Sequence, residues 1–564
     1  MKKLLQLKLC MLFMAVLCAI TTVKAQHYEK QVFRVKFEKS SEHQLTQMKT
    51  RLNAHGHIET GLSNVDLLTQ KHGVVKMKRV FPYAGKFEAK HQKHGLHLWY
   101  EVEIEGGADV LSAKNEFYAL SEISTSELVY KKSSRIYEEI MPSGNMTKTL
   151  SLPDGVNDPN YVDQWHYENN GQTGGKVDAD IDLDNAWLLE TGSMDVIVSI
   201  HDEGVDFDHE DLAGNMWINT AEIPNNGIDD DNNGFIDDIY GYNFAEGKGA
   251  ITPGNHGTHV AGTVAAESNN GIGGSGVAGG TGADDGVRMM SCQVFTGSGS
   301  RGFAASYVYA ADNGSVISQN SWGYTVPGSY EQSVMDAIDY FIAEAGYDEA
   351  GNQVGPMAGG IVIFAAGNDA DNDEYYPGYD DKVIAVAGTN HTDYKFYASN
   401  YGDWVDIAAP GENIFSSTVN DGYSGKYSGT SMACPHVSGV AALIVSKFKD
   451  QGLTPDHVRS RLVNTTDPLS FEGSEYWGTG RVNAYKALAD NDGVGPAAIT
   501  DLAISEISDQ SAMFTWTAPG DLPNESQVTT YELRYSTQPI DADNFGDATL
   551  FVTEKPSRPG QVRQ

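Results

Sequence analysis

Three widely separated segments of the sequence carry side chains that could act together in catalysis. A serine hydroxyl becomes an effective nucleophile only when a neighbouring base removes its proton during attack. Imidazole titrates near neutral pH and can accept that proton, and a carboxylate can fix the imidazole tautomer and stabilise the imidazolium that forms. The sequence offers this set in Asp202, His256 and Ser431, which lie in Val196-Ile-Val-Ser-Ile-His-Asp-Glu-Gly, Asn255-His-Gly-Thr-His-Val-Ala-Gly-Thr and Ser428-Gly-Thr-Ser-Met-Ala-Cys-Pro-His-Val.

Each of these residues alone also has an ordinary structural explanation. Asp202 could be one more turn-forming acid, and Ser431 could be a helix N-cap. His256 and His259 could be metal ligands or buried core histidines, although His-Gly-Thr-His lacks the four-residue spacing and the glutamate of a zinc-binding helix. The order Asp, His, Ser, with each residue in the strand or helix setting that its role requires, favours catalysis.

Between about residues 150 and 490, buried strands alternate with amphipathic helices, which is typical of an α/β fold whose parallel sheet has helices on both faces. The carboxyl ends of such strands and the adjoining helix starts are where sites assemble. The apolar runs predict strands at Val196–His201, Met289–Phe295, Ile361–Ala366 and Val383–Ala387, and helices at Thr258–Ala266, Phe303–Asn313, Tyr330–Ala345 and Pro435–Phe448.

From about Asn157 to Leu488 the chain resembles the subtilisin-like serine peptidases, because both the His-Gly-Thr-His-Val-Ala-Gly-Thr stretch and the Gly-Thr-Ser-Met-Ala-Cys-Pro-His stretch match signatures of that family. The resemblance implies a serine endopeptidase with Asp202, His256 and Ser431 as its triad. One departure is Glu203, which follows the aspartate where the family usually has Thr or Ser. We expect Glu203 to alter the pKa balance of the site without abolishing activity.

The same resemblance implies further site residues. Phe364-Ala-Ala-Gly-Asn-Asp matches the family segment that carries the oxyanion asparagine, which makes Asn368 the counterpart, although a turn-forming role would also explain this residue. Asn320-Ser-Trp-Gly matches the segment that lines the substrate groove, so we expect Ser321, Trp322 and Gly323 to bind substrate as an added strand. Trp322 could equally be a core residue.

Calcium is the cofactor that the acidic segments predict. Asn226-Gly-Ile-Asp-Asp-Asp-Asn-Asn-Gly-Phe-Ile-Asp-Asp shares the start of an EF-hand loop, but Tyr240 stands where the twelfth-position glutamate belongs. We predict a calcium loop that is not an EF-hand, the alternative being a solvated acidic turn. The predicted ligands of this loop are Asp229, Asp231, Asn233 and Asp237. From the family resemblance alone, a second site is expected at Gln164, Asp211 and Asn270, and calcium at either site would serve stability.

The regions outside the peptidase predict a secreted proenzyme. Residues 1–25, with Lys2, Lys3 and Lys8 before an apolar run, are typical of a secretory signal peptide. Residues 26–149 form a small α/β unit with predicted strands at Gln31–Phe37 and Leu96–Ile104, and Leu45, Met48 and Leu52 at helical spacing. Beside a peptidase of this kind, the unit resembles the inhibitory propeptide of the family, cut away between about Lys131 and Leu150. An independent binding domain is the alternative.

Residues 496–564 change to an all-β pattern and resemble a fibronectin type III module, a β-sandwich that is incomplete at the length shown.

The net charge is −37, and residues 151–564 carry 61 acidic against 17 basic residues. A protein surface with this excess of negative charge should repel nucleic acid and anionic membranes. No segment after the signal approaches 18 unbroken apolar residues, so no membrane span is expected. The expected partners are protein or peptide substrates and the propeptide. A second functional class stays open: a catalytically degenerate relative that acts as an extracellular binding or adhesion protein.

Overall fold

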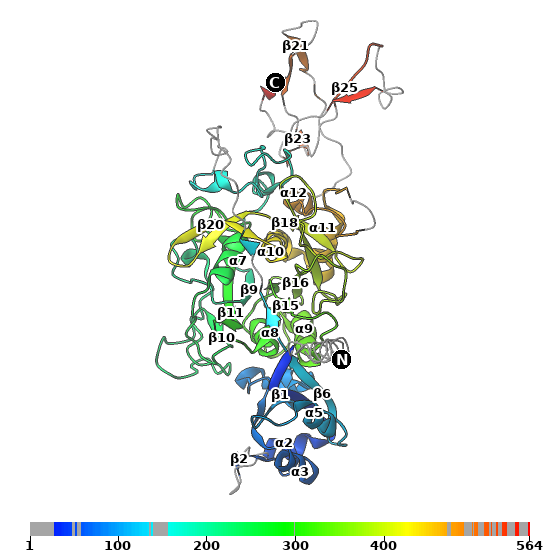
Figure 1. The fold of residues 1–564 in the computed structure, drawn as a ribbon. Coiled ribbons are helices and arrows are strands. Elements are labelled where there is room, and N and C mark those ends of the chain that lie inside the picture. Colours follow the sequence, from blue (N-terminus) through cyan, green and yellow to red (C-terminus); the bar gives the residue numbers. More distant parts are fainter. Residues whose placement is uncertain are drawn as a thin grey trace, which may run out of the picture. The chain divides into compact units, whose positions relative to one another are not determined.

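The computed structural model describes residues 27–134 apart from 48–50 and 53–57, residues 137–138, residues 156–489 apart from 298 and 471–474, and short stretches between 499 and 563 (Figure 1). The predicted signal peptide lies outside the described residues, as do residues 139–155 around the predicted end of the propeptide. The chain divides into two compact units. The first comprises Met1–Val80, His97–Lys131 and Tyr324–Gln332, and the second comprises Phe81–Leu96, Lys132–Gly323 and Ser333–Gln564.

The first unit is a four-stranded antiparallel sheet with helices packed on it. Alternate side chains of the first strand, among them Phe33 and Val35, are buried against Val110, Ala113 and Phe117 of a helix. In sheet order the strands are β4 (Val74–Arg79), β5 (Trp99–Ile104), β1 (Tyr28–Phe37) and β6 (Ile123–Tyr130), and the other elements are α2 (Glu42–Gln47), β2 (Arg51–Leu52), β3 (Ile58–Glu59), α3 (Ser63–Lys71) and α5 (Val110–Tyr118).

Both strands predicted for this unit are confirmed with changed starts. β1 begins three residues earlier than expected, and β5 begins at Trp99 because Leu96–Leu98 form a 3-10 helix. The helical assignment of Leu52 is wrong. Leu52 pairs with Ile58 across an antiparallel hairpin, so its backbone is extended.

The second unit contains a seven-stranded parallel sheet. Its strand order is β10-β11-β9-β14-β16-β17-β18, and each neighbouring pair is parallel. The four predicted strands are confirmed with small shifts at their ends, and β10, β14 and β18 are additional. In chain order the strands are β9 (Ile197–Asp202), β10 (Gly241–Asn243), β11 (Arg288–Gln293), β14 (Ile317–Asn320), β16 (Ile361–Ala365), β17 (Ile384–Thr389) and β18 (Ile407–Pro410).

Helices cover both faces of this sheet, as β9 illustrates. Val198 and Ile200 point into a core shared with α7 and α10. His201 points the other way, where it hydrogen-bonds Ser306 of α8 over 2.8 Å and stacks on Tyr307 of the same helix. The predicted α/β architecture is therefore confirmed. The helices of this unit are α4 (Glu88–Lys93), α6 (Leu183–Ala186), α7 (Asn255–Ala265), α8 (Phe303–Asp312), α9 (Gln332–Glu344), α10 (Thr430–Phe448), α11 (Pro455–Asn464) and α12 (Ala484–Leu488).

Helix α10 begins five residues before the predicted start at Pro435. Proline has no N–H and cannot donate to the carbonyl four residues earlier, which belongs to Ser431. That carbonyl accepts a hydrogen bond from the Ser321 hydroxyl over 2.7 Å instead, so the proline leaves no unpaired acceptor. Within the described residues, α10 is the one helix long and apolar enough to cross a membrane, and 94% of its apolar window is buried inside the protein.

Short strands complete the described structure. Among the residues after 499 that the structure describes, the strands pair in antiparallel fashion, and the complete sandwich predicted for 496–564 stays a prediction. The short strands are β7 (Lys132–Ser133), β8 (Tyr137–Glu138), β12 (Phe295–Thr296), β13 (Gly299–Ser300), β15 (Gly323–Tyr324), β19 (Ile414–Thr418), β20 (Gly422–Ser428), β21 (Ala503–Ser505), β22 (Met513–Thr517), β23 (Gly520–Asp521), β24 (Ser526–Gln527), β25 (Leu533–Tyr535), β26 (Thr549–Phe551) and β27 (Val562–Arg563).

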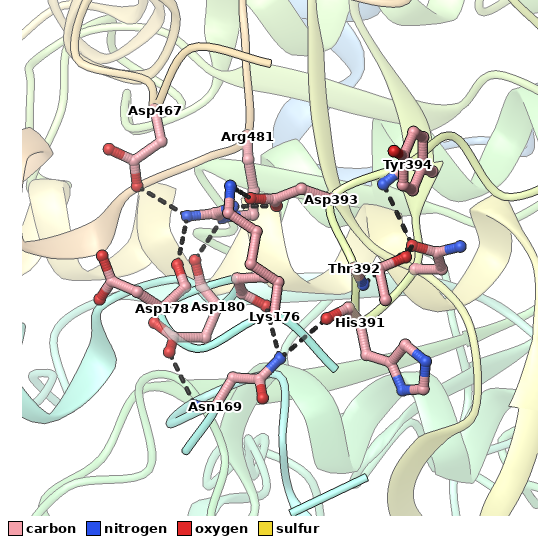
Figure 2. Close-up of polar contacts among 12 residues, drawn as sticks. Asn169, Lys176, Asp178, Asp180, His391, Thr392, Asp393, Tyr394, Asp467 and Arg481 are labelled. Carbon is pink, nitrogen blue, oxygen red and sulfur yellow. Dashed lines mark hydrogen bonds and ion pairs between the residues drawn. The ribbon is translucent and has the colours of Figure 1, made fainter. Parts of the chain in front are cut away.

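A buried arginine clasps distant segments of the second unit. Figure 2 shows Arg481 between two loops, where its guanidinium pairs with Asp393 and Asp467 and donates to the backbone carbonyls of Asp178 and Asp180. Only 4% of Arg481 is exposed, so nearly all of its donors are satisfied by protein acceptors. This arginine clasp therefore joins the loop at residues 178–180 to the segments that carry Asp393 and Asp467.

Candidate active site

The predicted site residues gather at the carboxyl edge of the parallel sheet. Asp202 ends β9, Ser321 directly follows β14, and Asn368 lies three residues after β16. The chain builds the sheet outward from β9 in both directions, with β11 on one side and β14 on the other. Such a reversal of strand order leaves a crevice at the carboxyl ends, which is the usual ligand position in open α/β sheets.

Asp202 and His256 form a buried hydrogen-bonded pair. The His256 Nδ1 atom lies 2.7 Å from Asp202 Oδ1, and the two residues are 2% and 0% exposed. Burial lowers the pKa of His256, but the charges of Asp202 and Glu203 outweigh burial and raise this pKa above its ordinary value. The His256 Nε2 atom has no hydrogen-bond partner within the described part of the chain. The imidazole is thus held through one nitrogen, and the other remains for a proton transfer.

Ser431 is the second residue of α10, which packs against α7, the helix that carries His256. Its hydroxyl donates to the carbonyl of Ser321 over 3.3 Å and not to His256. The structure therefore brings Asp202 and His256 into direct contact, whereas the serine hydroxyl makes a different bond. Catalytic hydrogen bonds of this kind often tighten only when substrate is bound.

Asn368 is anchored beside the serine. Its side-chain oxygen accepts hydrogen bonds from the Thr430 backbone N–H over 2.9 Å and from the Thr430 hydroxyl over 3.0 Å. These bonds hold the carboxamide in one orientation, and its NH2 group is the part that can donate. The N–H of Ser431 lies in the first turn of α10, where backbone N–H groups lack acceptors within the helix. The Asn368 NH2 group and the Ser431 backbone N–H are therefore two hydrogen-bond donors beside the serine.

The three predicted groove residues differ in their surroundings. Ser321 contacts Ser431 through both its hydroxyl and its carbonyl. The Trp322 ring is buried, 4.4 Å from the Phe303 ring and 5.2 Å from the Phe364 ring, which is the environment of a core residue. At Gly323 an added Cβ would meet no atom within 4 Å, so open space lies beside this backbone.

Comparison with known proteins agrees with this architecture. A model of the subtilase family matches residues 193–495, and a model of the N-terminal region of that family matches residues 33–171. Thermitase from Thermoactinomyces vulgaris is 35% identical over 312 residues, which cover 55% of this chain and 93% of thermitase. The chain belongs to the subtilase family. It is a serine peptidase, and its N-terminal region corresponds to the N-terminal domain of this family.

Other relatives of this subtilase extend the comparison. A calcium-dependent protease from Trichormus variabilis is 28% identical over 507 residues, which cover 79% of this chain and 66% of that protein. Several curated relatives are named as extracellular proteases. The chain spans 64% of a thermophilic serine proteinase from a Bacillus species and 55% of the extracellular basic protease from Dichelobacter nodosus. Fervidolysin from Fervidobacterium pennivorans superimposes with a TM-score of 0.56 at 23% identity, over 88% of this chain and 68% of the other, which shows the fold.

The first predicted calcium loop of the subtilase brings three carboxylates together. Ligand oxygens of Glu222, Asp229 and Asp231 lie within 4.8 Å of one another. Sequence reasoning missed Glu222, because it precedes the EF-hand-like spacing that identified the loop. Asp237 is directed elsewhere and accepts hydrogen bonds from the backbone N–H groups of Asn226 and Gly227. The remaining predicted ligand is held inside the loop: the Asn233 side chain bonds Phe235 N–H and the Asp238 carboxylate.

At the second predicted site, Asp211 and Asn270 are hydrogen-bonded over 2.9 Å. Asp158, which the sequence did not single out as a ligand, lies close enough for its charge to act on Asp211. Gln164 is instead engaged with the backbone of Ser275 through both ends of its carboxamide.

The two carboxylates of this second site suit a cation. Burial raises the pKa of Asp211 to about 7, and it also raises the pKa of Asp158. Both residues are 0% exposed, and no ion pair to either is found in the described part of the chain. Buried carboxylates need a proton or a cation, and oxygen ligands of this kind fit calcium.

Proposed function

We propose that this subtilase is a secreted, calcium-stabilised endopeptidase that is made as a proenzyme and forms an acyl-enzyme on Ser431. The observation that carries the proposal is the buried 2.7 Å bond between Asp202 and His256, with Ser431 and Asn368 at the same edge of the sheet. A scaffold that only displayed a binding module would need neither this pair nor the anchored asparagine.

The proposed reaction follows from the positions of these groups. The Ser431 hydroxyl would turn from Ser321 to His256 and attack the peptide carbonyl while Nε2 takes its proton. The oxygen that becomes negative would receive hydrogen bonds from the Asn368 NH2 group and the Ser431 N–H. His256 would then return the proton to the leaving amine, and a water molecule, deprotonated by the same nitrogen, would hydrolyse the acyl-enzyme. Asp202 would stabilise the imidazolium in both steps.

An organofluorophosphonate probe tests the proposed nucleophile. We expect the probe to label the processed protein at Ser431 and to abolish hydrolysis of a denatured protein substrate. Ser431→Ala should lose both labelling and hydrolysis while keeping the thermal unfolding temperature of the parent protein. Labelling at another residue, or hydrolysis by a well-folded Ser431→Ala protein, would refute the assignment. No labelling of processed protein would favour the binding-protein alternative.

The calcium part of the proposal assigns Asp158, Asp211 and Asn270 to one site and Glu222, Asp229 and Asp231 to another. The calcium-dependent relative supports it, and so do the converging oxygens of the two loops. Gln164, Asn233 and Asp237, the other predicted ligands, make protein hydrogen bonds in the structure. The assigned carboxylates do so too, since Asp231 pairs with Lys86 and Asp211 accepts from the Gly274 N–H, and calcium would have to compete with all of these bonds. Bound calcium would supply positive charge to buried carboxylates and would take no part in bond cleavage.

The proenzyme part rests on two short strands of the predicted propeptide that belong to the second unit. β8 pairs antiparallel with β20, so that Tyr137 is opposite Ser428, three residues before Ser431. β7 pairs with β15, which begins at Gly323, and the Lys132 ammonium lies 4.9 Å from the Phe303 ring centroid. The chain thus runs from a strand beside the predicted groove to a strand beside the predicted nucleophile. We place the cut between Ser134 and Tyr137, within the interval that the sequence predicts.

Sequencing the N-terminus of the mature protein tests this placement. The expected first residue is Arg135, Ile136 or Tyr137. The Ser431→Ala variant should stay at precursor length when no active protein is added. A mature protein that begins elsewhere would contradict the placement, and a Ser431→Ala precursor that cuts itself would contradict processing by Ser431. Recovery of the mature protein from the culture medium would test secretion, for which the signal-peptide pattern and the extracellular relatives are the support.

A further inference from the structure

Glu203 is bonded to both members of the buried pair. It directly follows β9 and is half-buried. Its carboxylate accepts a hydrogen bond from the backbone N–H of His256 over 3.0 Å, and its own N–H donates to Asp202 Oδ1 over 2.7 Å. The same Asp202 oxygen accepts from the His256 ring. One residue thereby contacts both parts of the site, through its side chain to the helix that carries the imidazole and through its backbone N–H to the Asp202 carboxylate.

The start of α7 needs such a partner. Backbone N–H groups in the first turn of a helix have no acceptor within the helix, and the side chain of the N-cap residue usually provides one. In α7 the N-cap is Gly254, which has no side chain and makes no side-chain cap. Glu203 supplies the acceptor from the neighbouring strand. A carboxylate at this end also interacts favourably with the helix dipole.

Two glycines make room for Glu203. A Cβ at Gly254 would overlap the carboxylate and the Cβ of Glu203, and a Cβ at Gly257 would overlap the carbonyl of Glu203. The backbone of Gly254 is extended, with φ at −136°, so its conformation does not demand glycine. Space for the Glu203 side chain therefore explains the glycine at 254, whereas at 257 the overlap is with the backbone of residue 203 and does not depend on its side chain.

We propose that Glu203 is a positioning residue for His256: its carboxylate caps α7 in place of the missing N-cap side chain, holds the imidazole against Asp202, and favours the imidazolium through its charge. This inference rests on the proposed role of His256 as the base. It assigns a purpose to the residue that replaces the usual Thr or Ser.

The groups that face His256 can be named from each neighbouring element. Asp202 comes from β9 and Glu203 from the turn after it, while His259 lies one turn further along α7 and Ser431 comes from α10. Burial lowers the pKa of His259 to about 3, so it stays neutral where the enzyme would work. Glu203 is thus one of two anions that favour a protonated His256.

The pH profile of kcat/KM separates this role from a merely structural one. Glu203→Gln keeps an acceptor but removes the charge. We expect the acidic limb of the profile to move to lower pH by about 0.5 to 1 unit, because the imidazolium loses a nearby anion. Glu203→Ala removes the cap as well, and we expect the same shift together with a kcat lowered about tenfold or more by misplacement of the base.

Asp339→Asn is the control for loss of one carboxylate, since Asp339 is exposed on α9 and pairs with Lys382. Its profile should match that of the parent protein. An unmoved acidic limb in Glu203→Gln, or a parental kcat in a folded Glu203→Ala protein, would overturn the positioning role. Failure of the base assignment itself would look different, because the Ser431 probe would then label nothing in the parent protein.

Discussion

At the residue scale, Asn368 and Thr430 fix each other. The Asn368 oxygen receives two hydrogen bonds from Thr430, the residue before the predicted nucleophile. These two bonds fix the orientation of the carboxamide, whose NH2 group is its only donor. A donor that is already in place costs no reorganisation when negative charge develops on the substrate oxygen, which is why such donors contribute strongly to catalysis.

Asn368→Ala should lower kcat by about 100- to 1000-fold and leave KM nearly unchanged, because the lost hydrogen bond forms mainly in the transition state. Steady-state kinetics on a peptide substrate measures both constants. Thr430→Val is the matched control, since it removes one bond to Asn368 but keeps the backbone bond and the donor, so its loss should be much smaller. Equal losses in the two variants, or a raised KM with parental kcat, would contradict an oxyanion role.

The sequence predicted the proposed catalytic residues but not the residues that hold them in place, for a physical reason. Asp202, His256, Ser431 and Asn368 lie in contiguous motifs whose local structure is predictable. The partners that hold these residues do not lie in such motifs. The acceptor of the Ser431 hydroxyl is Ser321, 110 residues away in the chain, and no local pattern encodes that contact. Glu222 was missed for a different reason, because it precedes the EF-hand-like spacing that identified the loop.

At the element scale, apolar periodicity predicted the strands of five or six residues in the parallel sheet and missed those of three or four residues, β10, β14 and β18. β14 reads Ile-Ser-Gln-Asn and is buried throughout, because its polar side chains find partners inside the protein. The start of α10 was also misplaced, because Pro435 is a typical first residue of a helix. The predicted architecture, a parallel sheet with helices on both faces, was nevertheless right, because the four correctly predicted strands β9, β11, β16 and β17 all belong to this sheet.

Close packing of α10 gives an element-scale prediction. An alanine in a helix is normally favoured over glycine by about 1 kcal/mol. At Gly439, however, an added Cβ would lie 2.5 Å from the Cβ of Val277, and overpacking of a core costs about 1 to 3 kcal/mol. Gly439→Ala should therefore destabilise the protein against thermal or urea unfolding. In a Val277→Gly background the same change should cost less, and equal costs in both backgrounds would show that this contact is not responsible.

At the scale of the whole molecule, calcium should couple loops that are distant in the sequence. Adding a chelator should lower the thermal unfolding temperature by about 5 °C or more, because a ligand at 100 times its Kd stabilises the native state by about 2.7 kcal/mol. Asp211→Asn should remove part of this response and Asp229→Asn another part, while Asp339→Asn should keep all of it. A chelator response that is the same in Asp211→Asn and the parent protein would exclude Asp211 as a ligand.

The arginine clasp gives the second prediction at this scale (Figure 2). Arg481→Met keeps a side chain of similar length but removes the shared donor of Asp393, Asp467 and two carbonyls, and the two aspartates keep only Lys176 and Lys486 as charged partners among the described residues. Loss of one partner of a buried ion pair costs about 3 to 5 kcal/mol. Arg459→Met is the matched control: its pair with Asp406 is partly exposed, at 29% and 21%, and should contribute about 1 kcal/mol or less.

Both arginine changes should be measured in the Ser431→Ala background, so that self-digestion does not mimic unfolding. The expected result is a clearly larger loss of unfolding free energy for Arg481→Met than for Arg459→Met. Neither arginine contacts Asp202, His256 or Ser431 in the described structure, so the same changes in the active protein should leave kcat/KM near parental at low temperature. Equal losses from the two changes would mean that the clasp contributes no more than a surface pair, and the segments that it joins would then depend on the hydrophobic core alone.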